Sequence, residues 1–270
     1  VNILQYTNIS EIKKSDLQEI ATFLNSAFNS KDFSYEYLDW LYFKNPCGPV
    51  LGFNAFHEEK IIGHYAVIPL LSSINGQEDK ILLSLNTAID KSHRNKKIFT
   101  DLANKTFSLA IDEGYDHVIG VANSKSITGF VKYLGFKVLH RLDAFISFTA
   151  PQFDERDSFI LWNKELSKWR LSSPKTKFFS NNTHIFSSYR IIFNALHSKL
   201  NFNNFVKEKT AMPPYLIIGS KKAFTFNNFF YFTIPNFLKP SPLVLINKKL
   251  NNNSYEVDSL LITTIDFDIF

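Results

Sequence analysis

Ile89-Asp90-Lys91-Ser92-His93-Arg94-Asn95-Lys96-Lys97-Ile98-Phe99 is the stretch on which the interpretation of this chain depends. The apolar run before it, residues 81–89, predicts a strand, and the run after it, residues 99–113, predicts a helix that ends at Gly114. The first turn of a helix has unpaired backbone N–H groups and the positive end of the helix dipole, so it attracts anions. The stretch therefore predicts a phosphate-binding turn, and the alternative is a solvated basic turn with no ligand.

A second motif follows the predicted helix. Residues 116–123 have the composition of a buried strand and end at Asn123. A helix-like run, residues 124–134, then leads to Gly135-Phe136. The chain order is therefore strand, basic turn, helix, strand, Asn, short helix and Gly-Phe.

These two motifs in this order resemble the acyl-CoA-binding region of the GNAT acetyltransferase superfamily. The first resembles the pattern hydrophobic-x-Pro-x-aromatic-Arg-Gly-x-Gly-Ile, and the residues in step with it are Ile89, Arg94, Lys96 and Ile98. The second keeps its places at Asn123, Phe130, Gly135 and Phe136. The departures are Lys91 for the proline, His93 for the aromatic, Asn95 and Lys97 for the two glycines, and Val131 for the tyrosine that follows Phe130. Asn95 tolerates a left-handed backbone, whereas the Cβ of Lys97 could crowd a phosphate.

The resemblance implies a mixed α/β (α+β) fold with a central twisted mixed sheet flanked by helices. The segment Trp40-Leu41-Tyr42-Phe43-Lys44-Asn45-Pro46-Cys47-Gly48 is also similar to a group of two-part bacterial members of the superfamily. Trp169 and Pro174 repeat the spacing of Trp40 and Pro46 approximately. We therefore expect a GNAT domain over residues 1–149 and a degenerate GNAT-like half over residues 150–270, the alternative for the latter being a family-specific α+β extension.

Secondary structure is expected along both halves. In the first, residues 3–7 predict a strand, and two amphipathic helices follow it. In the second, residues 158–168 and 188–200 predict helices, and later apolar runs predict strands. The second half has no basic turn of the kind at residue 94, so we expect it not to bind CoA.

The resemblance implies acetyl-CoA, or another acyl-CoA, as co-substrate, and direct attack of an amine on its thioester. The residues implied to bind it are Asn86, Thr87, Ala88, Ile89, His93, Arg94, Asn95, Lys96, Lys97, Ile98, Asn123, Ser126 and Phe130. Two of these have structural alternatives, because Asn123 could cap the next helix and Phe130 could belong to the core.

The proton-transfer groups are less well determined. The candidates are His64, whose imidazole could accept an amine proton, Asn123, and Tyr133, which lies two residues beyond the usual tyrosine place. Tyr35, Trp40 and His64 are candidates for contact with the acceptor, since aromatic rings stack on sugars and bases. A structural histidine and aromatic core packing are the alternatives.

Composition narrows the class of protein. The formal net charge of +5 suits an anionic ligand, and the basic residues are scattered without a nucleic-acid-binding motif, so we expect no nucleic-acid partner. The single cysteine, Cys47, excludes an intramolecular disulfide and a cysteine-based zinc cluster, and we expect no metal. No run approaches the ~18 apolar residues of a membrane-spanning helix. We expect a cytoplasmic protein without membrane insertion.

The function predicted from these observations is N-acyl transfer, most simply N-acetyl transfer, to a primary amine. The two-part relatives suggest an amino sugar carried on a nucleotide diphosphate, in surface-polysaccharide biosynthesis. One alternative acceptor is a peptide, polyamine or antibiotic amine. A second alternative is a non-catalytic GNAT scaffold. A monomer or a homodimer is compatible with two GNAT-like halves in one chain.

Overall fold

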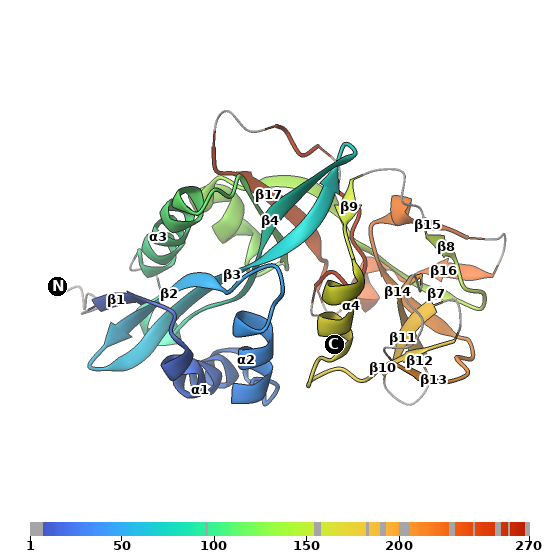
Figure 1. The fold of residues 1–270 in the computed structure, drawn as a ribbon, viewed down its shortest axis with the longest axis horizontal. Helices are drawn as coiled ribbons and strands as arrows, with labels where there is room; N and C mark the ends of the chain where they lie inside the picture. Colours follow the sequence, from blue (N-terminus) through green and yellow to red (C-terminus); the bar gives the residue numbers. More distant parts are fainter. Residues whose placement is uncertain are drawn as a thin grey trace.

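A computed structural model of the chain (Figure 1) describes residues 8–94, 97–153, 158–181, 184–189, 193–199, 206–226, 230–239, 241–251, 255–258 and 260–267. The α-helices of these residues are α1 (Leu17–Phe28), α2 (Tyr35–Phe43), α3 (Ile98–Asp112) and α4 (Lys164–Leu171). None of the described helices is both long and apolar enough to cross a membrane. The strand expected at residues 3–7 lies outside the described residues.

The first sheet is built mainly from the N-terminal half. Its strands, in spatial order, are β1 (Asn8–Glu11), β2 (Leu51–His57), β3 (Lys60–Ile74), β4 (Gln77–Ile89), β5 (His117–Ala122), β17 (Val244–Lys249) and β6 (Lys137–Arg141), with β9 (Phe159–Ile160) paired to β3. Neighbours are antiparallel except β4 and β5, which are parallel. The sheet is therefore mixed, as expected.

Helices cover both faces of this sheet (Figure 1). Successive residues of β3 alternate between the two cores: Ala66 packs with α1 and α2, and Tyr65 packs with α3. Local signals set the helix ends: the Ser34 hydroxyl accepts from the Tyr37 N–H at the start of α2, and Gly114 has a φ of 83° just after α3. The three-layer arrangement expected of the first half is confirmed.

The second sheet takes its strands from both sides of residue 149. In spatial order they are β13 (Lys207–Glu208), β10 (Phe178–Ser180), β11 (His184–Tyr189), β12 (Phe193–Lys199), β14 (Tyr215–Gly219), β7 (Asp143–Ser147) and β16 (Tyr231–Thr233). A small separate ladder joins β8 (Gln152–Phe153) to β15 (Phe224–Thr225). β7 belongs to the second sheet although it precedes residue 149, and β17 belongs to the first although it follows. The expected boundary therefore does not separate the two sheets.

The two sheets repeat the same pattern of pairing. In the first, β2, β3 and β4 are successively antiparallel, β4 and β5 are parallel, and β17 and β6 follow antiparallel. In the second, β10, β11 and β12 are antiparallel, β12 and β14 are parallel, and β7 and β16 follow antiparallel. Each half thus contributes its last strand to the sheet of the other half. The second half is a degenerate copy of the first, as the sequence predicted.

A reciprocal tryptophan contact joins the halves. Trp40 lies six residues after the N-cap Ser34 of α2, and Trp169 lies six residues after the N-cap Asn163 of α4. The two indole rings stack with centroids 5.0 Å apart. Each Nε1–H donates to the other residue's backbone carbonyl oxygen, at 2.9 Å and 3.0 Å. The similarity of these segments in the sequence therefore reflects a paired position in the structure.

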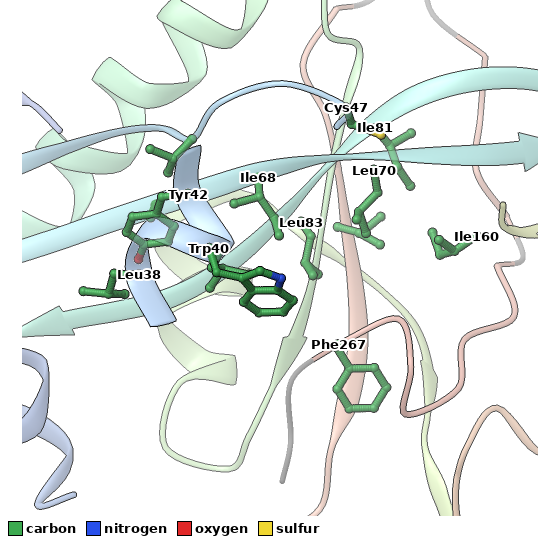
Figure 2. Close-up of a cluster of buried hydrophobic side chains, with 14 of the residues drawn as sticks. Leu38, Trp40, Tyr42, Cys47, Ile68, Leu70, Ile81, Leu83, Ile160 and Phe267 are labelled. Carbon is green, nitrogen blue, oxygen red and sulfur yellow. The ribbon is translucent and has the colours of Figure 1, made fainter. Parts of the chain in front are cut away.

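The core next to this contact is continuous across the two halves. Figure 2 shows Ile68, Leu70 and Leu83 on one face of the first sheet, with Trp40 and Phe267 close to them. Because Phe267 lies near the end of the chain, the C-terminal segment completes the core of the N-terminal half.

The second half differs from the first half in two respects. In the first half, residues 90–116 connect the parallel strands and contain α3, whereas the described part of the connection in the second half, residues 206–214, contains β13 and no helix. The segment that contains Thr263 and Thr264 lies where β12 and β14 stop pairing. Thr263 bridges to Gly219 of β14, and the Thr264 hydroxyl lies 2.7 Å from Nδ1 of His197 on β12. These contacts give a physical reason for the expectation that the second half does not bind CoA.

The secondary structure predicted for the second half was partly wrong. Residues 188–200 were expected to be a helix, but they contain the end of β11 and all of β12. Pairing in the sheet outweighs the weak helical propensity of this run. The helix expected at residues 158–168 begins only at Lys164, because Phe159 and Ile160 pair with β3.

Candidate functional site: an opening between β4 and β5

The parallel strands β4 and β5 pair over only three positions. These are Leu82 with Val118, Leu83 with Ile119, and Ser84 with Gly120. Beyond Ser84, β4 continues to Ile89 paired with β3, and β5 continues to Ala122 paired with β17. The two strands therefore separate in the middle of the sheet, and backbone groups that face the opening are free for a ligand with amide groups of its own.

A β-bulge lies on β4 just past the point of separation. His64 pairs with Ala88 but Ala66 pairs with Leu85, so β4 has an extra residue here. Asn86 takes up the distortion with a φ of 52°, a left-handed conformation that Asn adopts more readily than most residues. The Asn86 side chain is half-buried, and the neighbouring Thr87 hydroxyl is buried with no hydrogen-bond partner among the described residues. The bulge thus places polar side chains beside the opening.

A chain of buried hydrogen bonds ends at Asn86. Its Nδ2 donates to Oη of Tyr42 on α2 at 2.9 Å. Tyr42 Oη lies 2.9 Å from Nε2 of His64 on β3, and His64 Nδ1 lies 2.7 Å from Oδ1 of Asn54 on β2. Tyr42, His64 and Asn54 are fully buried. Four elements are therefore connected through polar side chains inside the core.

Burial sets the charge state of this chain. It lowers the pKa of His64 to about 3 and raises the pKa of Tyr42. Both groups are therefore neutral at neutral pH. The expectation that His64 contacts the acceptor and takes its proton is not supported, because the ring is inaccessible and both ring nitrogens have partners.

The basic turn follows β4 directly. Residues Lys91–His93 form a 3-10 turn in which the Asp90 carboxylate accepts from the Ser92 N–H and from Nδ1 of His93, both at 2.9 Å. The hydrogen bonds from Ser92 and then His93 lower the pKa of Asp90 to about 2. The Arg94 side chain is exposed, with its Nε 3.4 Å from the Ile89 carbonyl oxygen. Asn95 and Lys96 lie outside the described residues.

Lys97 occupies the place of the second glycine in the family pattern. Its φ of 58° is left-handed, and it is the N-cap of α3. The lysine therefore adopts the conformation for which glycine is ordinarily selected. Ile98 is 1% exposed and packs in the core, so its side chain is not available to a ligand. The turn leaves Lys91, Arg94 and Lys97 exposed near the first turn of α3.

The residues of the second motif have mainly structural contacts. The side-chain oxygen of Asn123 accepts from the N–H groups of Lys125 and Ser126, and the Ser126 hydroxyl accepts from the Asn123 N–H. Asn123 is therefore a cap, which was the structural alternative. Phe130 is 7% exposed and packs edge-to-face on Phe99.

The remaining candidates differ in their exposure. Trp40 is 5% exposed and committed to Trp169, so the expected stacking on an acceptor is wrong. Tyr35 at the start of α2 is partly exposed, and its contact with an acceptor stays a prediction. Tyr133 is 61% exposed on a π-helical turn, and its role in proton transfer also stays a prediction.

Sequence reasoning missed Tyr42 and Asn54 as parts of the site. Tyr42 was named only as part of the segment from Trp40 to Gly48 that resembles two-part members of the superfamily. The available signal for Asn54 was a single amide inside the apolar strand Phe53-Asn54-Ala55, where an amide needs a specific partner.

Comparison with known proteins agrees with this geometry. Residues 8–138 match the family model described as an acetyltransferase (GNAT) domain. None of the curated proteins is similar enough to this chain to count as a relative.

Several solved structures share the fold. A conserved protein of unknown function from Enterococcus faecalis is 9% identical, with a TM-score of 0.60 over 90% of this chain and 72% of its own. A GCN5-related N-acetyltransferase from Anabaena variabilis is 11% identical, with a TM-score of 0.57 over 90% and 73%. A protein from Pyrococcus horikoshii is 10% identical, with a TM-score of 0.53 over 96% and 95%. These structures extend across both halves, which supports a two-part fold.

Proposed function

We propose that this chain is an acyl-CoA-dependent N-acyltransferase that uses acetyl-CoA, because residues 8–138 match the model of a GNAT acetyltransferase domain. The observation that carries the proposal is the opening between β4 and β5, followed on the same strand by a basic turn and the first turn of α3. An acyl-CoA has the matching chemistry in the matching order: a thioester, an amide-containing pantetheine and a pyrophosphate.

The residues of β4 would bind the pantetheine arm. Its amides can pair with the backbone of Asn86, Thr87, Ala88 and Ile89, which faces no partner strand on the β5 side. Thr87 offers in addition a buried hydroxyl that has no hydrogen-bond partner in the described part of the chain. The pyrophosphate would bind His93, Arg94 and Lys97 together with the free N–H groups at the start of α3, where charge and dipole add.

The reaction needs a neutral amine in line with the thioester carbonyl. The amine nitrogen forms a bond to the carbonyl carbon, the C–S bond breaks, and the amine proton leaves to solvent while the thiolate is protonated. Among the described residues of β4 at the opening and at the end of β5, Asn86, Thr87 and Asn123, which directly follows β5, are polar but none is a base at neutral pH. The amine proton would therefore leave through water, Tyr133 stays the candidate for protonating the thiolate, and the contribution of the protein is mainly binding and orientation.

For the acceptor we favour an amino sugar carried on a nucleotide diphosphate. The net charge of +5 supports an anionic acceptor over a polyamine or other cationic amine. Tyr35, which is partly exposed at the start of α2, remains the aromatic candidate for stacking on such an acceptor. The stacking role of Trp40 forms no part of this argument.

A cytoplasmic location and a monomeric state complete the proposal. The single cysteine, Cys47, is buried and unpaired, which fits a reducing compartment. The two GNAT-like halves already pack on one another through Trp40 and Trp169 within one chain, which supports a monomer over a homodimer.

Acetyl-CoA binding measured by calorimetry tests the proposal. The unaltered protein should bind with a micromolar Kd, and Arg94→Ala should weaken binding about tenfold, close to 1.4 kcal/mol. Arg141→Ala, which removes an exposed arginine of β6, is the matched control and should bind like the unaltered protein. Equal binding by Arg94→Ala would refute the assignment of the pyrophosphate to this turn. Absence of binding would favour the non-catalytic scaffold.

A further inference from the structure

We infer that Tyr42, His64 and Asn54 are positioning residues that hold the side-chain amide of Asn86 so that its carbonyl oxygen accepts a hydrogen bond from the acceptor amine. This inference rests on the proposed function and names the groups that orient the nucleophile in it. Asn86 would then be the residue that contacts the reacting amine, whereas the other three act only through it.

The hydrogen bonds of the chain have a single consistent direction. Asn54 offers its carbonyl oxygen to His64, so Nδ1 of His64 carries the proton and Nε2 is the acceptor. Tyr42 must therefore donate its O–H to Nε2, which leaves the lone pairs of Oη to accept from Asn86 Nδ2. The amide orientations at the two ends agree with this direction, in which Nδ2 of Asn54 is buried without a hydrogen-bond partner among the described residues.

This direction determines which end of the Asn86 amide remains available. The NH₂ group is bound to Tyr42 in the core, so the carbonyl oxygen on the same carbon points away from it. Asn86 is half-buried, whereas the other three hydrogen-bonded residues, Tyr42, His64 and Asn54, are fully buried. The Asn86 amide therefore lies where the core meets the surface. An amide oxygen accepts an N–H without taking its proton, which orients an amine and leaves its lone pair free for attack.

The position of Asn86 is what makes this orientation useful. The bulge places it two residues beyond Ser84, the last residue of β4 that pairs with β5. The backbone of this segment is where the proposed function places the thioester end of the pantetheine. A left-handed residue at a bulge is strained unless its surroundings hold it, and the bond to Tyr42 holds this one.

The test compares three changes in the full chain. Tyr42→Phe removes the acceptor for the Asn86 amide, and His64→Leu removes the acceptor for the Tyr42 hydroxyl. His64→Gln keeps a hydrogen-bond acceptor and a donor at similar positions, so it should restore the series of hydrogen bonds from Asn54 to Asn86. Tyr65→Phe is the matched control. Tyr65 is as fully buried as Tyr42 and lies next to His64 on β3, but its hydroxyl accepts a hydrogen bond from Ser84 and has no part in the series that ends at Asn86.

Two measurements follow each variant. The first is thiol release from acetyl-CoA with UDP-glucosamine, glucosamine and spermidine as primary-amine probes, together with the Kd of acetyl-CoA. The second is the ¹⁵N spectrum of the histidine side chains at neutral pH, which reports the His64 tautomer. Thermal unfolding identifies any variant that fails to fold.

Tyr42→Phe and His64→Leu should lower kcat about tenfold or more with the Kd of acetyl-CoA unchanged, and His64→Gln should recover most of the rate lost in His64→Leu. His64 of the unaltered protein should carry its proton on Nδ1. Unchanged kcat in a folded Tyr42→Phe, or a proton on Nε2, would overturn the positioning role while leaving the proposed function intact. Failure of the unaltered protein to bind acetyl-CoA, or to release thiol with any probe, would overturn the proposed function and this inference with it.

Discussion

Replacing Trp169 with Phe should destabilise the protein substantially, although Trp169 lies far from Trp40 in the sequence. The backbone carbonyl of Trp40 lies in the last turn of α2, where helix carbonyls lack intrahelical partners. The N–H of Lys44, which would be its donor in a continuing helix, bonds instead to Asp39. The indole N–H of Trp169 is therefore the donor for that carbonyl, at 3.0 Å.

The size of the effect follows from two losses. Phenylalanine cannot donate, so a buried carbonyl loses its partner, at a cost of about 1–3 kcal/mol. The smaller ring also leaves apolar area unburied and weakens the stack with Trp40, a further cost of about 1 kcal/mol. Together these predict a loss of roughly 2–4 kcal/mol, or a fall in Tm of about 5–15 °C for a chain of this size.

Urea unfolding of Trp169→Phe, Trp40→Phe and the double variant checks the reasoning. Because the two rings stack and exchange hydrogen bonds, the loss in the double variant should be smaller than the sum of the single losses by about 1 kcal/mol or more. Tyr35→Phe, on the same helix but partly exposed, is the control and should change stability by less than about 0.5 kcal/mol. Additive losses, or a cost for Trp169→Phe below about 1 kcal/mol, would refute a reciprocal contact between the halves.

Three further changes test other parts of the structure. Lys97→Gly should raise the unfolding free energy by about 0.5–1 kcal/mol, because glycine adopts the left-handed φ of 58° without a Cβ clash. Lys97→Ala is the control and should show no gain. Equal stability of the two variants in urea would contradict a strained conformation at Lys97. Burial lowers the pKa values of His64 and His197 to about 3, so the unfolded chain binds more protons below its histidine pKa near 6.5. Stability should therefore fall as pH drops from 6.5 toward 4, by up to about 1.4 kcal/mol per pH unit for each histidine, and His64→Gln should remove one of the two contributions when unfolding is followed across this range. Gly219→Ala should lower Tm by several degrees, because a Cβ there would lie 2.5 Å from the Ile262 carbonyl oxygen in the segment that fills the second gap. Gly120→Ala, whose Cβ would meet only ordinary contacts at 3.5 Å and beyond, should have a smaller effect, and equal Tm values for the two would argue against that packing.

Much of the first half could be predicted because its signals are local. The spacing of apolar residues, the cap at Ser34 and the glycine after α3 each act within a few residues of the element that they define. The second half was harder, since its strands are held by partners distant in the sequence. β12 was mistaken for a helix because the residues that pair with it, on β11 and β14, carry no sign of that pairing in their own sequence.

In the candidate site, too, the local features were predicted, whereas the contacts between distant residues were not. The strand and the helix on either side of the basic turn were predicted close to their observed residues, because their apolar patterns are continuous stretches, whereas phosphate binding by the turn stays a prediction. His64, Trp40 and Asn123 were given ligand contacts because a residue's type does not reveal its burial or its partners. The structure instead connects His64 to Tyr42, Trp40 to Trp169, and Asn123 to the N–H groups of the following turn.

The sequence by itself determined most of the order of elements in the first half and predicted an acyl-CoA motif and a repeated half, because periodicity, caps and motif spacing are properties of neighbouring residues. Only the tertiary structure decided that β7 and β17 are exchanged between the sheets, that Thr263 and Thr264 lie where β12 and β14 stop pairing, and that a buried series of hydrogen bonds ends at Asn86. The physical reason is that strand pairing, burial and side-chain hydrogen bonds depend on which distant residues meet. No local pattern records those encounters.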